Sequence, residues 1–508
     1  MNPGPNPQPL RHLRFKRQIP DLPTPLKIFL LLISLVFAGV RVGAVELAKP
    51  TPDQRAFMDM ELGVFFHFDL NTFTGQEHGD GKESPKRFNP TALDCDQWVR
   101  TAKSMGAKYA VLTARHEGGF CLWPTATTEY SIKNSPYKNG QGDIVREFVD
   151  ACHKYGLKVG LYHTAGVDSR HTFIAPDGKR HLGDDHGADD LSQNGHAGDE
   201  KYTALQVAQL TELLTNYGEI SYIWSDHWSG GGVWRAVTDT MRKLQPHCLM
   251  QGPDVTTAGN ENGYVTYPLW NAINTVDGTI YSRATVTKAD HSLPNDYGLL
   301  ETDVLTGHPF GKIWRSRESD TNTAFERGGW FWHPGKTSVK SLAEHVDLYY
   351  RTIGLGANLI VNLPPDDRGL IPDDLVAAAK EFGNEISRRF SKPIAQANEV
   401  RNGDMVELKW PKPCPINTIV LRENIADGQK IAAYTLEARV SGDWVPLLPA
   451  NHFPTAKPPF NPSPDFETIG QKKIDRVEPV VTDQIRFRCL KSIAQPTELR
   501  SIAVYDVQ

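Results

Sequence analysis

Short apolar runs and amphipathic segments alternate along the chain between residues 55 and 390. Each apolar run is nearly continuous and is followed by a stretch with helical spacing of its apolar positions; the clearest runs lie at residues 62–68, 109–115, 158–164, 221–226, 248–254 and 357–365. Buried strands separated by helices indicate a parallel sheet that helices cover. So many strand–helix units in one stretch predict a closed (β/α)8-type, TIM-like barrel rather than an open sheet.

The pattern changes at two places. Between residues 266 and 327 the periodicity is weak, so the strands there cannot be counted. After about residue 392, apolar and polar positions alternate over short runs such as MVELKW, INTIVLREN and YTLEARV, which is typical of an antiparallel β-sandwich. The sequence therefore predicts a barrel over residues 45–390 and a β-sandwich domain over residues 391–508.

The first 44 residues have the features of a signal peptide. Basic residues precede an apolar run from Ile28 to Val40, which is too short to span a bilayer comfortably, and small residues lead up to Ala44. We expect cleavage after Ala44 and an exported protein, periplasmic or extracellular, with no stable membrane insertion. An uncleaved membrane anchor is the alternative.

Cleavage would leave a strongly acidic chain. The 508 residues carry a formal net charge of −5, and the first 44 include six Lys or Arg and one Asp, so the remaining chain carries −10. This charge argues against nucleic acid as a partner. An apolar content of 39% is enough for a large core. The composition does not indicate an oligomeric state.

The six cysteines are widely spaced, and no two form a C-x-x-C pair. This spacing argues against a zinc ribbon and against a redox dithiol. Cys414 and Cys489 share the predicted sandwich, so a disulfide between them stays open for a protein in an oxidising compartment.

Polar residues gather where the predicted barrel strands end. These residues are His67, Arg115, His116, Glu117, Tyr162, His163, Asp226 and Asp254, with Glu261 just beyond. Because the carboxyl ends of barrel strands converge on one mouth, we expect these side chains around one pocket. We expect aromatic residues at the same mouth, namely Phe120, Trp123, Trp224, Trp228, Trp270, Trp314 and Trp330.

This combination of side chains suits a sugar. Sugar rings stack on aromatic faces, and two carboxyl groups beside a glycosidic bond can supply a nucleophile and a proton donor. Other interpretations are core histidines, Asp226 as a helix N-cap, or a metal held by His116, Glu117, His163 and Asp226. No H-E-x-x-H motif supports a metal, and RHLGDDHGADD (180–190) lacks the spacing of a calcium loop. We expect no metal and no cofactor.

Several long motifs occur between Arg55 and Arg389. They are GVFFHFDLNTFTGQEHGDG, ARHEGGFCLWPTATTEYSIKNSPYKNGQGDIVREFVDACHKYGLKVGLY, LTELLTNYGEISYIWSD, QGPDVTTAGNENG, and GGWFWH followed by NLIVNLPPDDRGLIP. Together they resemble the α-L-fucosidases of glycoside hydrolase family 29, in particular the subgroup acting on α-1,3/1,4-linked fucose. IVLRENIADGQKI also resembles the sandwich that follows such barrels. The resemblance implies a retaining exo-glycosidase that removes terminal α-L-fucose from fucosylated or related oligosaccharides and polysaccharides.

The same resemblance implies roles for individual residues. Asp226 corresponds to the nucleophile, and Glu261 to the acid that protonates the leaving oxygen and then activates water. The residues corresponding to sugar contacts are His67, His116, Glu77, Trp330 and, from the third strand, either Tyr162 or His163.

Three positions depart from the family pattern. His116-Glu117 stands where the family has two adjacent histidines, Asp226-His227 stands in place of Asp-Gly, and Thr256 in place of an arginine. At Glu117 a carboxylate acceptor replaces an imidazole donor, so we expect Glu117 to line the pocket and to change which sugar hydroxyls are accepted. Two alternatives follow: an α-L-galactosidase on the same scaffold, and a catalytically silent carbohydrate-binding protein.

Overall fold

The structure is a computed structural model and describes most of the chain beyond residue 45. The described residues are 46–164, 168–171, 200–226, 232–257, 263–265, 267–273, 307–322, 329–335, 339–450 and 466–507. The predicted signal peptide, Glu261, Trp228 and the segment 180–190 therefore lie outside them. No helix within the described residues is long and apolar enough to cross a membrane.

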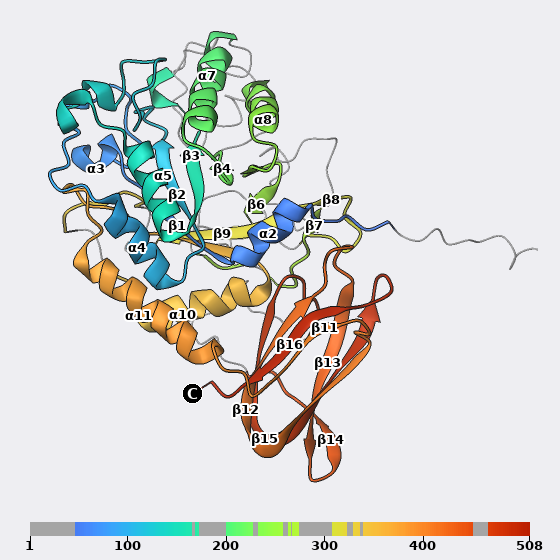
Figure 1. Ribbon diagram of the computed structural model, residues 1–508. Helices are drawn as coiled ribbons and strands as arrows, with labels where there is room; N and C mark the ends of the chain where they lie inside the picture. The colour runs from blue at the N-terminus through green and yellow to red at the C-terminus, as the bar shows by residue number, and fades with distance from the viewer. Residues whose placement is uncertain are drawn as a thin grey trace, which may run out of the picture. The chain divides into compact units, whose positions relative to one another are not determined.

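Eight strands form one parallel sheet in the order β5-β4-β3-β2-β1-β10-β9-β6 (Figure 1). At its two edges, a parallel bridge joins Gln251 to Val255, and the Gly252 N–H donates to the Val255 carbonyl at 2.7 Å, so the sheet closes almost completely. The predicted barrel is confirmed. Its strands are β1 (Leu62–Phe66), β2 (Tyr109–Arg115), β3 (Lys158–His163), β4 (Tyr222–Trp224), β5 (Leu249–Met250), β6 (Val255–Thr257), β9 (Ser316–Asn322) and β10 (Asn358–Asn362).

Helices connect these strands. They are α2 (Pro52–Met60), α3 (Leu70–Thr74), α4 (Cys95–Met105), α5 (Ile144–Tyr155), α7 (Glu200–Asn216), α8 (Gly232–Leu244), α10 (Leu342–Arg351) and α11 (Asp373–Phe390). Short 3-10 helices are η1 (Pro85–Arg87), η2 (Ile132–Asn134), η3 (Tyr137–Gly140), η4 (Ser169–His171) and η8 (Ile353–Leu355). Local sequence sets the helix ends: the Asp94 side chain accepts from the Gln97 N–H at 2.9 Å, and Gly106 ends α4 with φ of 99°.

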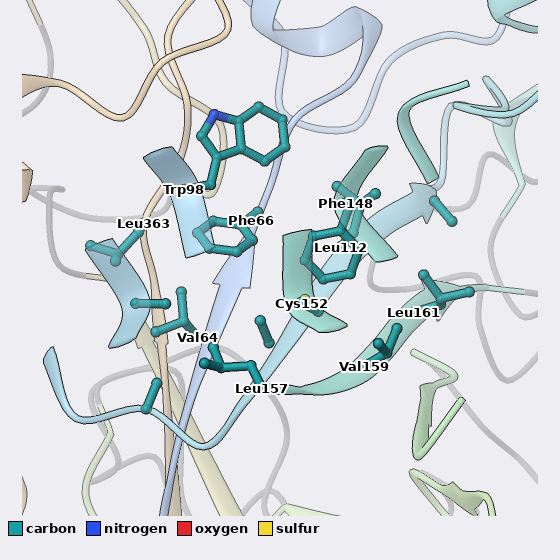
Figure 2. Close-up of a cluster of buried hydrophobic side chains, with 14 of the residues drawn as sticks. Val64, Phe66, Trp98, Leu112, Phe148, Cys152, Leu157, Val159, Leu161 and Leu363 are labelled. Atoms are coloured by element: carbon teal, nitrogen blue, oxygen red, sulfur yellow. The ribbon is translucent and has the colours of Figure 1, made fainter. Parts of the chain in front are cut away.

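The two faces of each barrel strand pack against different parts of the protein. The outward residues, such as Val64, Phe66, Leu112 and Leu161, pack beneath α4 and α5; Figure 2 shows them against Trp98, Phe148 and Cys152. All of these side chains are buried. Because burial of each large apolar side chain contributes about 1.5–3 kcal/mol, this layer fixes the strands against the helices.

The inward residues fill the barrel in layers. Gly63 lies opposite Tyr109, and a Cβ added at Gly63 would lie 2.2 Å from the Tyr109 ring, so the glycine makes room for the ring. Two residues further along the strands, Phe65 lies opposite Val111, and Val111 lies opposite Gly160. The lower layers are thus packed, and the inward positions beyond them face the mouth.

The described part of the stretch that could not be counted from sequence, residues 267–273 and 307–322, contains three strands. β7 (Ala272–Ile273) and β8 (Ile313–Trp314) form an antiparallel pair, and β9 is a barrel strand with the sequence SRESDTN. Its first six residues, 316–321, are buried. Partners inside the protein make this possible: Glu318 accepts hydrogen bonds from the hydroxyls of Tyr109 and Tyr222.

The C-terminal strands form an antiparallel sheet in the order β11-β16-β12-β15-β13-β14. Two strands, β12 and β15, are 19 and 20 residues long, and a register shift between Lys409 and Cys414 marks an irregularity where a strand bends. Their inward residues share one apolar core, which confirms the predicted sandwich. The bounds are β11 (Ala395–Val400), β12 (Met405–Glu423), β13 (Ile431–Val440), β14 (Asp443–Pro446), β15 (Lys473–Ser492) and β16 (Leu499–Tyr505).

All six cysteines are free thiols. Cys414 lies opposite Thr482, whereas the Cys489 N–H donates to the carbonyl of Asp404, at the other end of β12. Ten residues of extended strand span about 33 Å, far more than the Cα separation that a disulfide allows. The disulfide considered between Cys414 and Cys489 is therefore absent.

Candidate active site

Asp226 is held at the end of β4 by two hydroxyl groups. The Tyr162 hydroxyl donates to its Oδ2 at 3.0 Å, and the Thr164 hydroxyl donates to its backbone carbonyl at 3.2 Å. Helix α8 is described from Gly232 onward. The carboxylate thus has a hydrogen-bond donor on the inward face of the neighbouring strand, as a residue of the site would.

Tyr162 and His163 point to opposite faces of β3. Tyr162 lies opposite Trp224 on the inward face. Burial and the charge of Asp226 raise the pKa of the Tyr162 hydroxyl well above its usual value, so the group stays protonated and donates. His163 instead contacts Gln209 of α7 at 3.2 Å, and burial followed by the charge of Arg115 lowers its pKa to about 3. Of the two candidates, Tyr162 is the one that faces Asp226.

His67 follows β1 and is buried at the mouth. Its Nδ1 lies 2.9 Å from Oδ1 of Asn362, whose Nδ2 donates to the Trp330 carbonyl at 2.6 Å. Because that amide oxygen accepts, Nδ1 carries the proton and Nε2 is left with its lone pair. Burial and the neighbouring His116 hold the pKa of His67 well below its usual value. Neutral His67 can therefore accept a hydrogen bond from a sugar hydroxyl.

Rings close the site around these groups. His116 stacks on Tyr162 at 5.1 Å between centroids, with an interplanar angle of 26°. Phe331 meets His116 edge-on at 5.0 Å, and Trp330 lies 5.0 Å from His67. His67, His116, Tyr162, Asp226 and Trp330 come from five separate segments of the chain and therefore form one contiguous group of side chains, which we call the wall of the candidate site.

Glu77 contacts the segment that carries Trp330. Its carboxylate accepts from the Trp330 backbone N–H at 2.7 Å and lies 2.8 Å from Nε2 of His333. These contacts tie the segment after α3 to the segment that carries Trp330. Glu77 therefore fixes Trp330 in the wall.

Glu117 follows His116 in the chain and is buried, with 5% of its side chain exposed. Its Oε2 lies 2.7 Å from Nδ1 of His78. Burial is the largest influence on the pKa values of both His67, which it lowers, and Tyr162, which it raises. The charge of Glu117 acts to raise both pKa values. The carboxylate is therefore close enough to act on the pocket.

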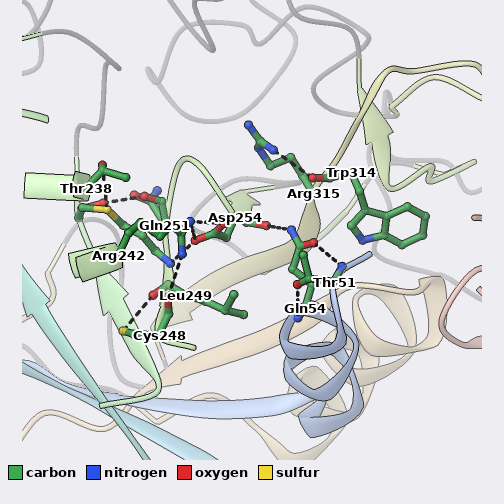
Figure 3. A network of polar contacts seen from close by, with 12 residues as sticks. Thr51, Gln54, Thr238, Arg242, Cys248, Leu249, Gln251, Asp254, Trp314 and Arg315 are labelled. Atoms are coloured by element: carbon green, nitrogen blue, oxygen red, sulfur yellow. Dashed lines mark hydrogen bonds and ion pairs between the residues drawn. The ribbon is translucent and has the colours of Figure 1, made fainter. Parts of the chain in front are cut away.

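Two other residues expected at the mouth have structural roles. Asp254 accepts two hydrogen bonds of 2.5 Å from Arg242 and one of 2.8 Å from the Met250 N–H; Figure 3 shows this network beside Gln54. Arg115 pairs with Asp168, and both side chains are fully buried. Charged residues at strand ends pair with backbone and helix groups as readily as they bind ligands. A position at the end of a strand therefore does not by itself distinguish a structural residue from a ligand-binding one.

Three of the aromatic residues expected at the mouth pack in the core instead. Trp123 is buried and donates to Glu212 of α7, Phe120 packs on Phe88 and Tyr130, and Trp314 packs with Met58 and Ile425. Of the seven aromatic residues considered, Trp330 lies in the wall described above and Trp224 packs edge-on against Phe65 inside the barrel. Tryptophans are large apolar side chains, and most of these fill the core.

Sequence reasoning missed the carboxyl groups of β9. Glu318 points into the barrel, and Asp320, two residues further, shares its face. Burial and the charge of Asp226 raise the pKa of Asp320 to about 7. The carboxyl groups of Asp320 and Asp226 therefore act on each other. No apolar run marks this strand, so its sequence carries no signal of a buried strand. Within the described ranges, no three His, Cys, Asp or Glu side chains form a group that could hold a metal.

Comparisons with known proteins agree on one family. The family model for Alpha-L-fucosidase matches residues 72–388. Alpha-L-fucosidase 1 of Arabidopsis thaliana is 30% identical over 444 residues, which is 78% of this chain and 79% of that protein. A crystal structure of a glycoside hydrolase 29 family member from an unknown rumen bacterium is 30% identical, with TM-score 0.72, covering 91% of this chain and 78% of that one. A crystal structure from Bacteroides thetaiotaomicron is 31% identical, with TM-score 0.73, covering 91% of this chain and 100% of that one.

Proposed function

The chain belongs to the α-L-fucosidase family of glycoside hydrolases, and we propose that it removes terminal α-L-fucose from glycans by double displacement through Asp226 and Glu261. The observation that carries the proposal is the contact of Asp226 with Tyr162 beside neutral His67 and the Trp330 wall. A nucleophile needs a fixed carboxylate, and a sugar needs acceptors and a ring face around it.

In the first step, a carboxylate oxygen of Asp226 bonds to the anomeric carbon while the glycosidic C–O bond breaks. Glu261 gives its proton to the leaving oxygen, and a β-linked fucosyl ester forms on Asp226. In the second step, Glu261 takes a proton from water, whose oxygen displaces Asp226 and restores the α configuration. This mechanism needs the two carboxyl groups about 5–5.5 Å apart.

Tyr162 acts in both steps. Its hydroxyl holds Oδ2 of Asp226 at 3.0 Å, which fixes the orientation of the carboxylate for attack in the first step. As the ester forms and the carboxylate loses its charge, the hydrogen bond weakens, and as the ester breaks it strengthens again. A donor that follows the charge on the carboxylate stabilises Asp226 as the leaving group of the second step.

We further propose the substrate subgroup and the location. The motifs that resemble the α-1,3/1,4 subgroup support a fucose that is linked to an inner sugar of a branched glycan. The basic and apolar residues before Ala44 support export. Sequencing the amino terminus of the protein recovered from its native cell would test export, since an intact residue 1 would contradict it.

An aryl α-L-fucoside assay tests the proposed activity. The wild-type chain should hydrolyse the fucoside faster than the matched α-L-galactoside, and proton NMR should show the α anomer of fucose as the first product. Faster turnover of the galactoside would favour the α-L-galactosidase alternative, because L-galactose differs from L-fucose by a hydroxyl on carbon 6. Binding without turnover of either would favour the silent carbohydrate-binding protein.

Azide separates the roles of the two carboxyl groups. In Glu261→Ala the ester on Asp226 still forms from an aryl fucoside, and azide attacks it without a general base, which gives the α-fucosyl azide. In Asp226→Ala no ester forms, so any azide product arises by direct displacement and is the β-fucosyl azide. The opposite pattern would exchange the two roles.

A further inference from the structure

Asn362, the last residue of β10, joins two parts of the candidate site. Its side-chain oxygen lies 2.9 Å from Nδ1 of His67, and its side-chain nitrogen donates to the Trp330 carbonyl at 2.6 Å. Asn362 and His67 are both buried, with 0% and 3% of their surfaces exposed. Because water does not compete for buried hydrogen bonds, these two contacts hold the amide group of Asn362 in one orientation.

The register of the barrel strands places Asn362 beside His67. Asn362 lies opposite Phe65 of β1, two residues before His67, and shares a face of β10 with Ile360, which packs in the core inside the barrel. The Leu363 N–H donates to the Phe65 carbonyl at 2.9 Å, so the two strands stay paired up to this level. The sheet itself therefore brings the amide group to the imidazole.

The two partners of Asn362 also contact each other. The rings of His67 and Trp330 lie 5.0 Å apart between centroids, with an interplanar angle of 34°. Because the Trp330 N–H donates to Glu77 at 2.7 Å, the backbone of Trp330 is held at its N–H as well as at its carbonyl. Asn362, His67 and Trp330 thus form a closed set of three contacts.

The direction of these hydrogen bonds decides what His67 offers to a ligand. An amide nitrogen donates and a carbonyl accepts, so the nitrogen of Asn362 faces the Trp330 carbonyl and its oxygen faces His67. Nδ1 of His67 then carries the proton, which makes Nε2 an acceptor. Burial and the neighbouring His116 hold the pKa of His67 well below its usual value, so the ring stays neutral. Within the described ranges, the His67 ring makes no other hydrogen bond.

Resting on the proposed function, we propose that Asn362 is a positioning residue that fixes His67 as the hydrogen-bond acceptor for a fucose hydroxyl and holds Trp330 beside it. The sugar must then supply the donor at this point. Both tasks need an amide, because one group must accept from the imidazole and donate to the carbonyl. Aspartate has a similar shape but lacks the donor when ionised, and leucine lacks both groups.

The tautomer of His67 can be measured in the wild-type protein. Proton–nitrogen NMR correlation spectra of protein labelled with 15N-histidine show which ring nitrogen carries the proton, and the spectrum of His67→Gln identifies the His67 signals. We expect a neutral ring protonated at Nδ1 from pH 6 to pH 8. A proton on Nε2, or a ring that becomes charged within this range, would overturn the inference without the need for any Asn362 variant.

A set of substrates shows whether Asn362 acts through His67. The set is an aryl α-L-fucoside and its 2-deoxy, 3-deoxy and 4-deoxy analogues, and each variant is compared with the wild type on the same substrate. His67→Ala should lower kcat/KM about tenfold where the hydroxyl bound by Nε2 is present, as expected for one lost hydrogen bond, and much less on the analogue that lacks it.

Asn362→Leu should reproduce this pattern. It should lower kcat/KM for the fucoside at least tenfold, and its smallest loss should fall on the same deoxy analogue as that of His67→Ala. The variant also loosens Trp330, so some loss is expected on every substrate. Equal losses on all four substrates, or a smallest loss on a different analogue, would contradict the positioning role.

Asn358 offers a matched control in the same strand. It is a buried asparagine four residues before Asn362, and its Nδ2 donates to the Phe57 carbonyl at 2.8 Å. It lies at the other end of β10 and has no contact with His67. Asn358→Leu should lower the unfolding temperature but keep kcat/KM within about twofold of the wild type on all four substrates.

Failure of this inference is distinguishable from failure of the proposed function. Wild-type turnover of the aryl fucoside combined with the wrong tautomer, or with the wrong substrate pattern, would overturn the role of Asn362 and leave the proposed function intact. A wild-type chain that hydrolyses none of the four substrates would overturn both.

Discussion

At the scale of single residues, the barrel mouth contains carboxyl groups in different surroundings. Asp226 has the Tyr162 hydroxyl as a donor and lies partly open to the mouth. Asp320 is buried, and burial and the nearby Asp226 raise its pKa to about 7. Below that pH Asp320 keeps a proton and adds no second negative charge beside the nucleophile. Separate environments that push the pKa values of neighbouring acids apart are the usual way to give them different roles.

Tyr162→Phe tests the hydrogen bond to Asp226. Since the hydroxyl donates to a carboxylate whose charge changes in both steps, its loss should lower kcat/KM for an aryl α-L-fucoside about 10- to 100-fold. The fold should stay intact, because the ring and its stacking on His116 remain. Steady-state kinetics and circular dichroism measure the two effects.

Tyr222→Phe is the matched control for that change. It removes the same group one layer deeper, where the hydroxyl donates to Glu318 at 2.8 Å and does not contact Asp226. Its kcat/KM should stay within about threefold of the wild type, whereas its stability should fall by about 1 kcal/mol. Equal kinetic losses in the two variants would mean that Tyr162 acts through packing alone.

Some site residues could be predicted from the sequence, and others could be placed only with the structure. His67, His116 and Asp226 directly follow apolar strands, so the barrel prediction was enough to bring them together. The choice between Tyr162 and His163 needed the strand register, because adjacent residues of a strand face opposite sides. The contact between His78 and Glu117 depends on two segments meeting in space, for which one sequence carries no signal.

At the scale of elements, β9 shows the limit of periodicity. Its sequence, SRESDTN, contains no apolar residue, yet its residues 316–321 are buried. Partners replace apolar burial here, since Tyr109 and Tyr222 bind Glu318, and Arg317 donates to the Trp270 carbonyl. The strand predicted from the run at residues 248–254 is only partly correct, because β5 ends at Met250 and β6 begins at Val255 after a turn. Hydrophobic pattern finds strands that are stabilised by apolar burial and misses those that are stabilised by buried hydrogen bonds.

Glu318→Gln tests the buried carboxyl of β9 through the pH dependence of stability. Burial raises the pKa of Glu318 to about 8 from a usual 4.5, although the two tyrosine hydroxyls act in the opposite direction. Over this window the unfolded chain releases a proton that the folded chain retains, so folded stability should fall as pH rises, by up to about 1.4 kcal/mol per pH unit. Glutamine has no such proton, so the variant should gain stability relative to the wild type between pH 5 and pH 8.

Chemical denaturation at pH 5, 6, 7 and 8 measures this difference. Glu219→Gln is the control, because Glu219 is 73% exposed in its pair with Lys158. Its unfolding midpoint should follow the wild type at every pH. A Glu318→Gln curve parallel to the wild type would mean that Glu318 is ionised in the folded protein.

At the scale of the whole molecule, charged contacts join the barrel to the sandwich. Glu61, just before β1, lies 2.8 Å from Nζ of Lys472 and also pairs with Arg422. Burial would raise the pKa of Glu61, but the two cations lower it to about 2. The Tyr267 hydroxyl adds a hydrogen bond of 2.9 Å to the Thr468 carbonyl. Barrel and sandwich could each be predicted from their own patterns, whereas this junction could not, because its partners lie some 400 residues apart.

Glu61→Ala tests the junction. It leaves Lys472 and Arg422 partly buried without their carboxylate, so the free energy of unfolding should fall by about 3 kcal/mol at pH 7. The pKa of Glu61 is lower in the folded chain, so its contribution is present above pH 4.5 and should be lost as the pH falls toward 2. Thermal unfolding at pH 7 and pH 3 measures both. The exposed pair of Lys158 and Glu219 is the comparison, and Glu219→Ala should change stability by less than about 0.5 kcal/mol.

The central claim is that Asp226 is the nucleophile of a retaining α-L-fucosidase, and covalent trapping tests it most directly. A 2-deoxy-2-fluoro-L-fucosyl fluoride slows both steps through its ring fluorine, while the good fluoride leaving group lets the first step proceed, so the ester accumulates. We predict time-dependent loss of activity, one added fluorofucosyl unit per chain by mass spectrometry, and the label on the peptide that contains Asp226. A label on Asp320 or on any other residue, or full occupancy of the site with no covalent mass, would contradict the account.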